Sequence, residues 1–254
     1  MNLVLDLSES LHGDKCDTLV KQILFDTLRE YPETTRMLEF YGNLSPERVT
    51  NQQVLTELSW VIYSSGFRYD IVKAYWPAIA KAFEQFDVMK VAGMAEDLEV
   101  QAKDVCRRSG FRNLRKAIWC IKNAQRILEL DFEKGPVGGL RGYLSQLAKK
   151  NHRELVESAP DLVRELGFVG IGNTTIFHLM KNLGFDIFKP DIHVRRVLSG
   201  LKLIAGENSP VSEISEAMLQ LSSASGMRVS ELDTLLFIYG RVTGDLARQI
   251  AGTH

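Results

Sequence analysis

Hydrophobic residues recur along this chain at spacings of three and four, which is the period of an amphipathic α-helix. The pattern predicts helices over 16–30, 54–64, 69–86, 90–94, 97–108, 113–130, 140–148, 154–158, 211–221, 229–240 and 245–250. Pro77 stands inside one of them, where a kink or break is expected. No segment alternates with the period of two that is typical of strands, so we expect an all-α protein.

Two glycines one residue apart, Gly170 and Gly172, separate two further helical segments. Such a turn needs glycine to reach positive φ and to pass close to another backbone. The second helix is expected to begin at Asn173 or Thr174 and to end before Gly184. Its first N–H groups have no partners within the helix, and they lie at the positive end of the helix dipole. The turn therefore predicts an anion site, whose natural ligand on an extended polymer is a phosphate.

Residues 168–175 (FVGIGNTT), 191–197 (DIHVRRV) and 110–118 (GFRNLRKAI) carry a family resemblance. This order of hairpin, short loop and aspartate-capped helix resembles the helix-hairpin-helix DNA glycosylase superfamily. Residues 58–61 (LSWV) and 82–92 are similar to its bacterial 3-methyladenine glycosylase I branch. The resemblance covers roughly residues 55 to 200. It implies a two-lobed helical bundle with a cleft between the lobes. A central lobe spans about 52–150, and residues 1–51 with 151–254 form a second lobe that contains the hairpin at 160–183.

The resemblance implies a catalytic role for Asp191. Cleavage of an N-glycosidic bond builds positive charge on the sugar, and a carboxylate beside the anomeric carbon stabilises that charge. The same carboxylate can orient or deprotonate the attacking water. The structural alternative is that Asp191 caps a helix beginning at Ile192, and the two roles are compatible.

Strand cleavage in this superfamily uses a lysine nucleophile at the start of the second hairpin helix. Thr174 stands there in this chain, and threonine cannot form the Schiff base. Lys181 and Lys189 do not match the motif position, and we interpret them as solvated residues or phosphate contacts. We therefore expect release of a base without cleavage of the strand.

Contacts with the DNA backbone are expected at the hairpin and on the helix that follows Asp191. The candidates are Gly170, Gly172, Asn173, Thr174, Arg195 and Arg196. The resemblance also implies a monovalent cation that can bridge the hairpin backbone to a phosphate. Further basic residues either add to this footprint or are solvated surface; they are Arg107, Arg108, Arg112, Arg115 and Lys116.

Base flipping requires a side chain that fills the gap in the duplex and a pocket that receives the base. A turn between two helices falls where the superfamily carries its strand-plugging loop; it comprises Ser65, Gly66, Phe67, Arg68 and Tyr69. Phe67, Arg68 or Tyr69 is the plug, unless this is an ordinary turn with a buried aromatic residue. Trp60 and Trp119 are either base-stacking or core residues. Gln52 and Gln53 stand near the place of the recognition glutamate of the 3-methyladenine branch, and Glu57 is the nearest acid.

Composition limits these hypotheses in three ways. A formal net charge of −1 argues against a large electrostatic footprint for nucleic acid, though not against a local one. Cys16, Cys106 and Cys120 are far apart, so we expect reduced thiols, no cofactor and no structural metal, including the zinc site of the 3-methyladenine branch. The amino terminus has acidic residues where a signal peptide has basic ones, and no apolar run approaches membrane length. We expect a cytoplasmic protein without membrane contact.

These observations together predict a monomeric, monofunctional DNA glycosylase that acts on damaged bases in double-stranded DNA. Because the 3-methyladenine branch typically lacks the aspartate that this chain has, neutral lesions as well as alkylated bases are candidate substrates. One alternative is a non-catalytic protein that uses the hairpin only to bind the DNA backbone. A second is a helical scaffold for protein partners, which would make the hairpin glycines a coincidence.

Overall fold

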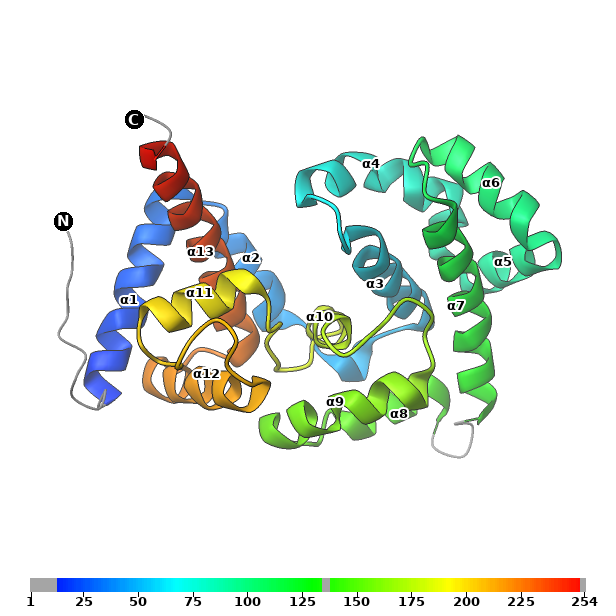
Figure 1. Cartoon of the computed structure of the whole chain (residues 1–254). Coiled ribbons are helices and arrows are strands. Elements are labelled where there is room, and N and C mark those ends of the chain that lie inside the picture. The colour runs from blue at the N-terminus through cyan, green and yellow to red at the C-terminus, as the bar shows by residue number, and fades with distance from the viewer. Residues whose placement is uncertain (1–12, 134–137, 252–254) are drawn as a thin grey trace. The chain divides into compact units, whose positions relative to one another are not determined.

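The computed structural model of this chain describes residues 13–133 and 138–251, and every regular element within those two ranges is a helix (Figure 1). The all-α prediction is thereby confirmed. Residues 1–12, where no signal peptide is expected, lie outside the described residues. The chain divides into two compact units. The terminal unit combines Met1–Leu44 with Asp186–His254, and the central unit is Ser45–Phe185.

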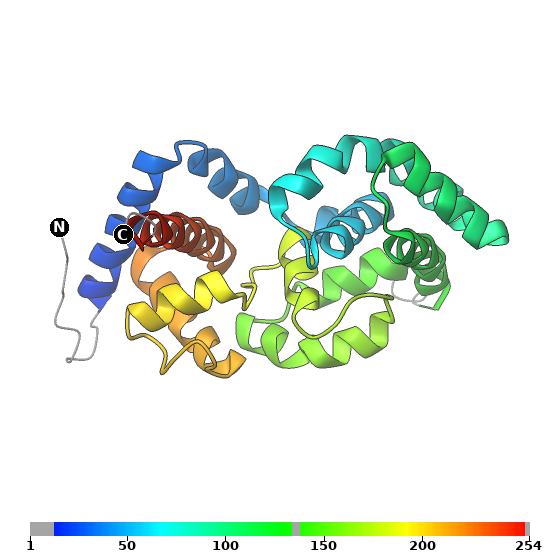
Figure 2. The same ribbon diagram turned by 45° about the horizontal axis from the view of Figure 1, so that its top comes forward.

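The terminal unit is built around its carboxy-terminal helix. Its helices are α1 (Gly13–Glu30), α2 (Thr34–Asn43), α11 (Ile192–Gly200), α12 (Val211–Ser225) and α13 (Val229–Ala251). The last of these, α13, contacts each of the other four, and α1 also packs on α12 (Figure 2). Leu232, Leu235 and Leu236 are fully buried on the α13 side of this core, opposite Val20 and Ile23 of α1. Segments from both ends of the sequence thus share one hydrophobic core.

The central unit is arranged around α7. Its α-helices are α3 (Asn51–Ser64), α4 (Tyr69–Ala82), α5 (Val88–Gly93), α6 (Leu98–Ser109), α7 (Leu114–Glu133), α8 (Gly139–Leu147), α9 (His152–Leu166) and α10 (Thr175–Asn182). Short 3₁₀ segments η1 (Pro46–Arg48), η2 (Glu84–Phe86) and η3 (Met94–Asp97) connect them. Helix α7 contacts α3, α5, α6 and α8. Its buried residues recur every three or four positions, from Ala117 through Ile121 and Ala124 to Ile127, so one face of α7 forms the middle of the core.

Several helix boundaries differ from the expectations, and one helix was not predicted. Of the residues of α2, the helix that was missed, only Thr34 is buried. The predicted 154–158 segment and the first hairpin helix are a single helix, α9, which continues through Pro160. The predicted tail at 245–250 is part of α13.

The division between the units also differs from the predicted one. The hairpin was assigned to a lobe formed with residues 151–254, whereas the central unit extends to Phe185. The physical reason is packing, since α10 contacts α3 and α9. None of the helices in the described ranges combines the length and the apolar character needed to cross a membrane.

Candidate functional site

The hairpin between α9 and α10 begins at a glycine in the left-handed region. Gly167 ends α9 with φ +63°, and the chain then buries Phe168 and Ile171 beneath the turn. Gly170, between them, has φ +84°. A Cβ atom at this position would lie 2.5 Å from Cε3 of Trp119. Both facts require glycine at position 170, as the sequence predicted, although the close neighbour is an aromatic ring and not a backbone.

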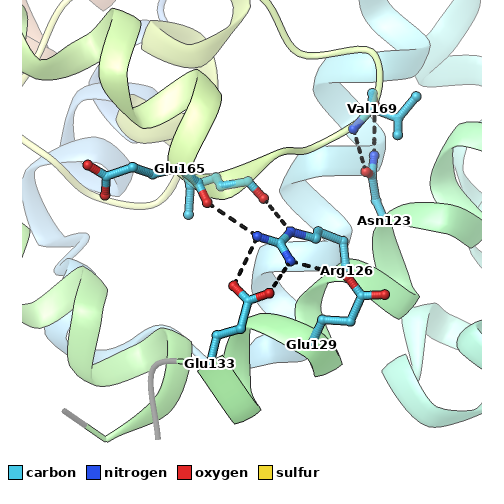
Figure 3. A network of polar contacts seen from close by, with 7 residues as sticks. Asn123, Arg126, Glu129, Glu133, Glu165 and Val169 are labelled. Atoms are coloured by element: carbon cyan, nitrogen blue, oxygen red, sulfur yellow. Dashed lines mark hydrogen bonds and ion pairs between the residues drawn. The ribbon is translucent and has the colours of Figure 1, made fainter. Parts of the chain in front are cut away.

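Asn123 of α7 holds the hairpin by two hydrogen bonds to one residue (Figure 3). The backbone N–H of Val169 donates to Asn123 Oδ1 at 2.7 Å, and Asn123 Nδ2 donates to the carbonyl of Val169 at 2.9 Å. Because Asn123 is fully buried, its end of each bond is shielded from water. The side chain thus replaces the hydrogen-bond partner that a neighbouring strand would give to an extended segment.

Arg126, almost one turn later on α7, holds the end of α9 (Figure 3). Its guanidinium donates to the carbonyls of Leu166 at 2.9 Å and Glu165 at 3.3 Å. Ion pairs with Glu133 at 2.7 Å and Glu129 at 3.2 Å complete its coordination, and the hydrogen bond to Glu133 raises the pKa of Arg126. Helix α7 therefore fixes the hairpin on both sides of Gly167.

The start of α10 leaves several backbone N–H groups without acceptors, but not the expected set. The N–H of Gly172 donates to Thr175 Oγ1 at 2.7 Å, which corrects the expectation that it is free to bind a phosphate. Within the described chain, the N–H groups of Gly170, Asn173 and Thr174 donate to no acceptor. Asn173 and Thr174 are also exposed. The N–H donors of an anion site are thus present, but Asn173 takes the place that was expected of Gly172.

Gly172 is not strained. Its φ is not positive, and a Cβ atom built on it would meet no atom within 4 Å. Its carbonyl accepts the first hydrogen bond of α10, from Ile176 N at 2.9 Å. Positive φ and close backbone approach therefore explain the glycine at 170 but not the one at 172.

Asp191 lies at the start of α11 in the terminal unit and caps that helix. Its Oδ1 accepts from the backbone N–H groups of His193 at 2.9 Å and Val194 at 3.1 Å. Its Oδ2 forms an ion pair with Lys189 Nζ at 3.6 Å, and 14% of the side chain is exposed. The capping interpretation is confirmed. The backbone fixes one carboxylate oxygen, and the other faces the ammonium group of Lys189.

Arg195 and Arg196 occupy different environments on α11. The guanidinium of Arg195 donates to the carbonyls of Pro190, Glu207 and Ser209 at 3.1, 3.0 and 2.6 Å. It therefore holds the loop before α12 in place, a structural role that the sequence did not indicate. It also lines a cavity of about 560 Å³ together with Ile192 and residues 207–211. Arg196 is exposed and pairs with Glu207 at 3.3 Å.

Phe67 anchors the turn between α3 and α4 through contacts with two residues. The Phe67 ring packs edge-on against Phe111 at 5.1 Å, and Lys116 Nζ lies 5.2 Å from its centroid. Lys116 also donates to the carbonyls of Ile62 and Ser65. Because Lys116 is buried, which lowers its pKa, the expectation that it forms solvated surface or a phosphate contact is wrong.

Every residue of that turn, from Ser65 to Tyr69, is exposed to solvent. Ser65 and Gly66 are exposed, Arg68 has 81% of its side chain exposed, and Tyr69 is 41% exposed. Of the basic residues on α6 and the segment after it, Arg107 and Arg108 form ion pairs with Asp104, whereas Arg112 and Arg115 are exposed. Arg68 is thus the most accessible of the three plug candidates, and Phe67, at 42%, is as exposed as Tyr69.

The two candidate tryptophans both make packing contacts. Trp60 is half-buried and lies edge-on to Trp76 at 5.0 Å and to Tyr69 at 5.8 Å. Trp119 lies beneath Gly170, and the guanidinium of Arg115 sits 5.1 Å from its ring. Trp119 therefore supports the hairpin from below.

Glu57 was named only as the nearest acid to an expected position, yet it is the most perturbed carboxyl group described. It lies on α3 and accepts a hydrogen bond from Asn182 Nδ2 of α10 at 2.9 Å. Burial raises its pKa from 4.5 to about 7, and the Asn182 bond opposes this shift. The signal in the sequence was an acid flanked by the core positions Leu55 and Leu58.

Comparison of the chain with family models, with curated proteins and with solved structures finds no match.

Proposed function

We propose that this protein is a monofunctional DNA glycosylase, which flips a damaged base out of the duplex and hydrolyses its N-glycosidic bond. The observation that carries the proposal is a rigid glycine hairpin with unpaired N–H groups, followed along the chain by an oriented carboxylate on Asp191. Double-stranded DNA is the proposed partner. We propose that the protein acts as a monomer in the cytoplasm.

The hairpin contributes the grip on the DNA backbone. The free N–H groups of Gly170, Asn173 and Thr174 point to a phosphate ligand because they lie at the positive end of α10. Asn123 and Arg126 hold these donors in place before the ligand arrives, which lowers the entropic cost of binding. Such contacts position a duplex without reading its sequence.

Asp191 contributes the chemistry. As the glycosidic bond breaks, positive charge develops on the sugar, and a fixed carboxylate stabilises that charge more than a mobile one would. Capping of α11 fixes Oδ1, so Oδ2 is the oxygen assigned to the sugar and to the attacking water. Lys189 Nζ lies 3.6 Å from Oδ2.

Thr174 at the motif position supports hydrolysis without lyase chemistry, because a hydroxyl group cannot form a Schiff base. Lys181 is buried and Lys189 is paired with Asp191. The attacking group is therefore assigned to water.

The test is a panel of duplexes, each with one alkylated, deaminated or oxidised base. We expect release of at least one base, leaving abasic sites that persist until alkali or heat is applied. Failure to release any base from the panel would contradict the proposal. A covalent adduct trapped by borohydride would contradict the monofunctional assignment.

A second candidate is a non-catalytic protein that binds the DNA backbone through the hairpin. It is favoured by one observation, the capping of α11 by Asp191, which gives that residue a structural purpose without catalysis. Binding to undamaged and damaged duplexes without any release of base would support it.

A further inference from the structure

The chain crosses between the two units twice, once between Leu44 and Ser45 and once between Phe185 and Asp186. Within the terminal unit, residues next to both crossings contact the same side chain, that of Arg228. Its Nη1 lies 3.0 Å from the carbonyl of Gly42 and 3.4 Å from that of Leu44, at the end of α2. Its Nε lies 3.7 Å from Asp186 Oδ1. One guanidinium therefore joins two segments that are far apart in the sequence.

Arg228 is itself fixed at the beginning of α13. Its backbone N–H donates to Glu231 Oε2 at 2.8 Å. Asp186 Oδ1 also accepts from the backbone N–H of Ser230 at 3.0 Å, so the residue next to the second crossing caps the first turn of α13. Since α13 contacts every other helix of the terminal unit, this anchor belongs to the most rigid part of that unit.

The hydrogen bonds from Arg228 to backbone carbonyls contribute most of the stabilisation at this anchor. Arg228 Nη1 donates to three carbonyls at the end of α2, including that of Tyr41 at 3.3 Å. Charge-assisted bonds to the negative end of a helix are favourable. The ion pair with Asp186 is partly exposed and contributes little by itself, so Asp186 acts mainly through its bond to Ser230.

We infer that Arg228 is a positioning residue. It holds the chain against α13 at both crossings, and it thereby limits the orientations that the central unit adopts relative to the terminal unit. Two connections fixed to one point leave a hinge at that point, whereas connections free to move independently allow a wider range of rotation. The inference does not depend on the proposed activity, because it rests on bonds within the terminal unit.

The test measures the distance between spin labels placed at Ser212 of α12 and Lys103 of α6, both exposed, with the half-buried Cys106 replaced by serine. We expect Arg228→Met to broaden the distance distribution about twofold, as release of a hinge constraint requires. Asp186→Asn keeps an oxygen for Ser230 N and should broaden it less. Arg195→Met is the matched control, since Arg195 also donates to three carbonyls of the terminal unit but touches neither crossing.

Equal widths for folded Arg228→Met and the parent protein would overturn the inference. Equal broadening by Arg195→Met would overturn it as well, because general softening of the unit would then explain the result. If Arg228→Met does not fold, Arg228→Lys takes its place, since one ammonium group cannot span both crossings. Circular dichroism establishes folding in each case.

Discussion

Gly170 and Gly172 are one residue apart, yet the structure constrains them differently. Gly170 combines positive φ with a close approach to Trp119, so the fold itself requires glycine there. Gly172 has ordinary φ and open space around it. Nothing in the fold requires glycine at position 172, and under the proposed function the open space there admits a phosphate against the backbone.

This difference predicts opposite outcomes for matched substitutions. Gly172→Val should change the free energy of unfolding by only about 0.5 kcal/mol, as for other exposed positions, while weakening binding to undamaged duplex roughly tenfold. Gly170→Val should cost about 2 kcal/mol or more of stability, through strain and the clash with Trp119. Thermal unfolding and fluorescence anisotropy measure the two quantities. Normal DNA affinity in folded Gly172→Val would remove the hairpin from the proposed interface.

At the scale of elements, Glu57 and Asn182 join α3 to the hairpin helix α10. Because the pKa of Glu57 is raised to about 7 in the folded protein, the carboxyl group binds a proton there at pH values at which the unfolded chain has released it. The stability that this proton contributes is fully present below about pH 4.5 and is lost as the pH rises through 7.

Glu57→Gln should therefore stabilise the protein at high pH. The amide still accepts from Asn182 and carries no charge at any pH. The difference in unfolding free energy between Glu57→Gln and the parent should grow by about 3 kcal/mol between pH 4.5 and pH 8, since every tenfold change in proton affinity corresponds to about 1.4 kcal/mol. Urea unfolding at a series of pH values measures it. Parallel pH profiles for the two proteins would show that Glu57 has an ordinary pKa.

The helical period predicted most elements because most helices bury a stripe of apolar residues, but it missed α2, of which only Thr34 is buried. For the candidate site, the pattern around Asp191 predicted the helix cap, and Gly170 predicted the strained turn. The pattern could not predict the contacts that Asn123, Lys116 and Arg195 make. Each of these polar side chains satisfies carbonyls that are distant in sequence, and only the fold brings them together.

Both ends of the chain form one unit, and this unit does not include residues 151–185. Periodicity shows which side chains of α9 and α10 are buried, and it does not show which helix covers them. The contacts of α10 with α3 and α9, and of the hairpin with α7, assign residues 151–185 to the central unit. Asp191 belongs to the terminal unit. The proposed DNA-binding hairpin and the proposed catalytic residue are therefore parts of different units.

Single-turnover release of a neutral damaged base by Asp191→Asn, with duplex affinity measured in parallel, decides whether Asp191 is catalytic. The substitution is conservative, because the asparagine side chain still offers an oxygen to the N–H groups of His193 and Val194 and so keeps the cap of α11. We expect affinity to be unchanged and the rate to fall by about a hundredfold or more, the loss typical of removing a charge partner of the transition state. An unchanged rate in the folded variant would contradict a catalytic role for Asp191.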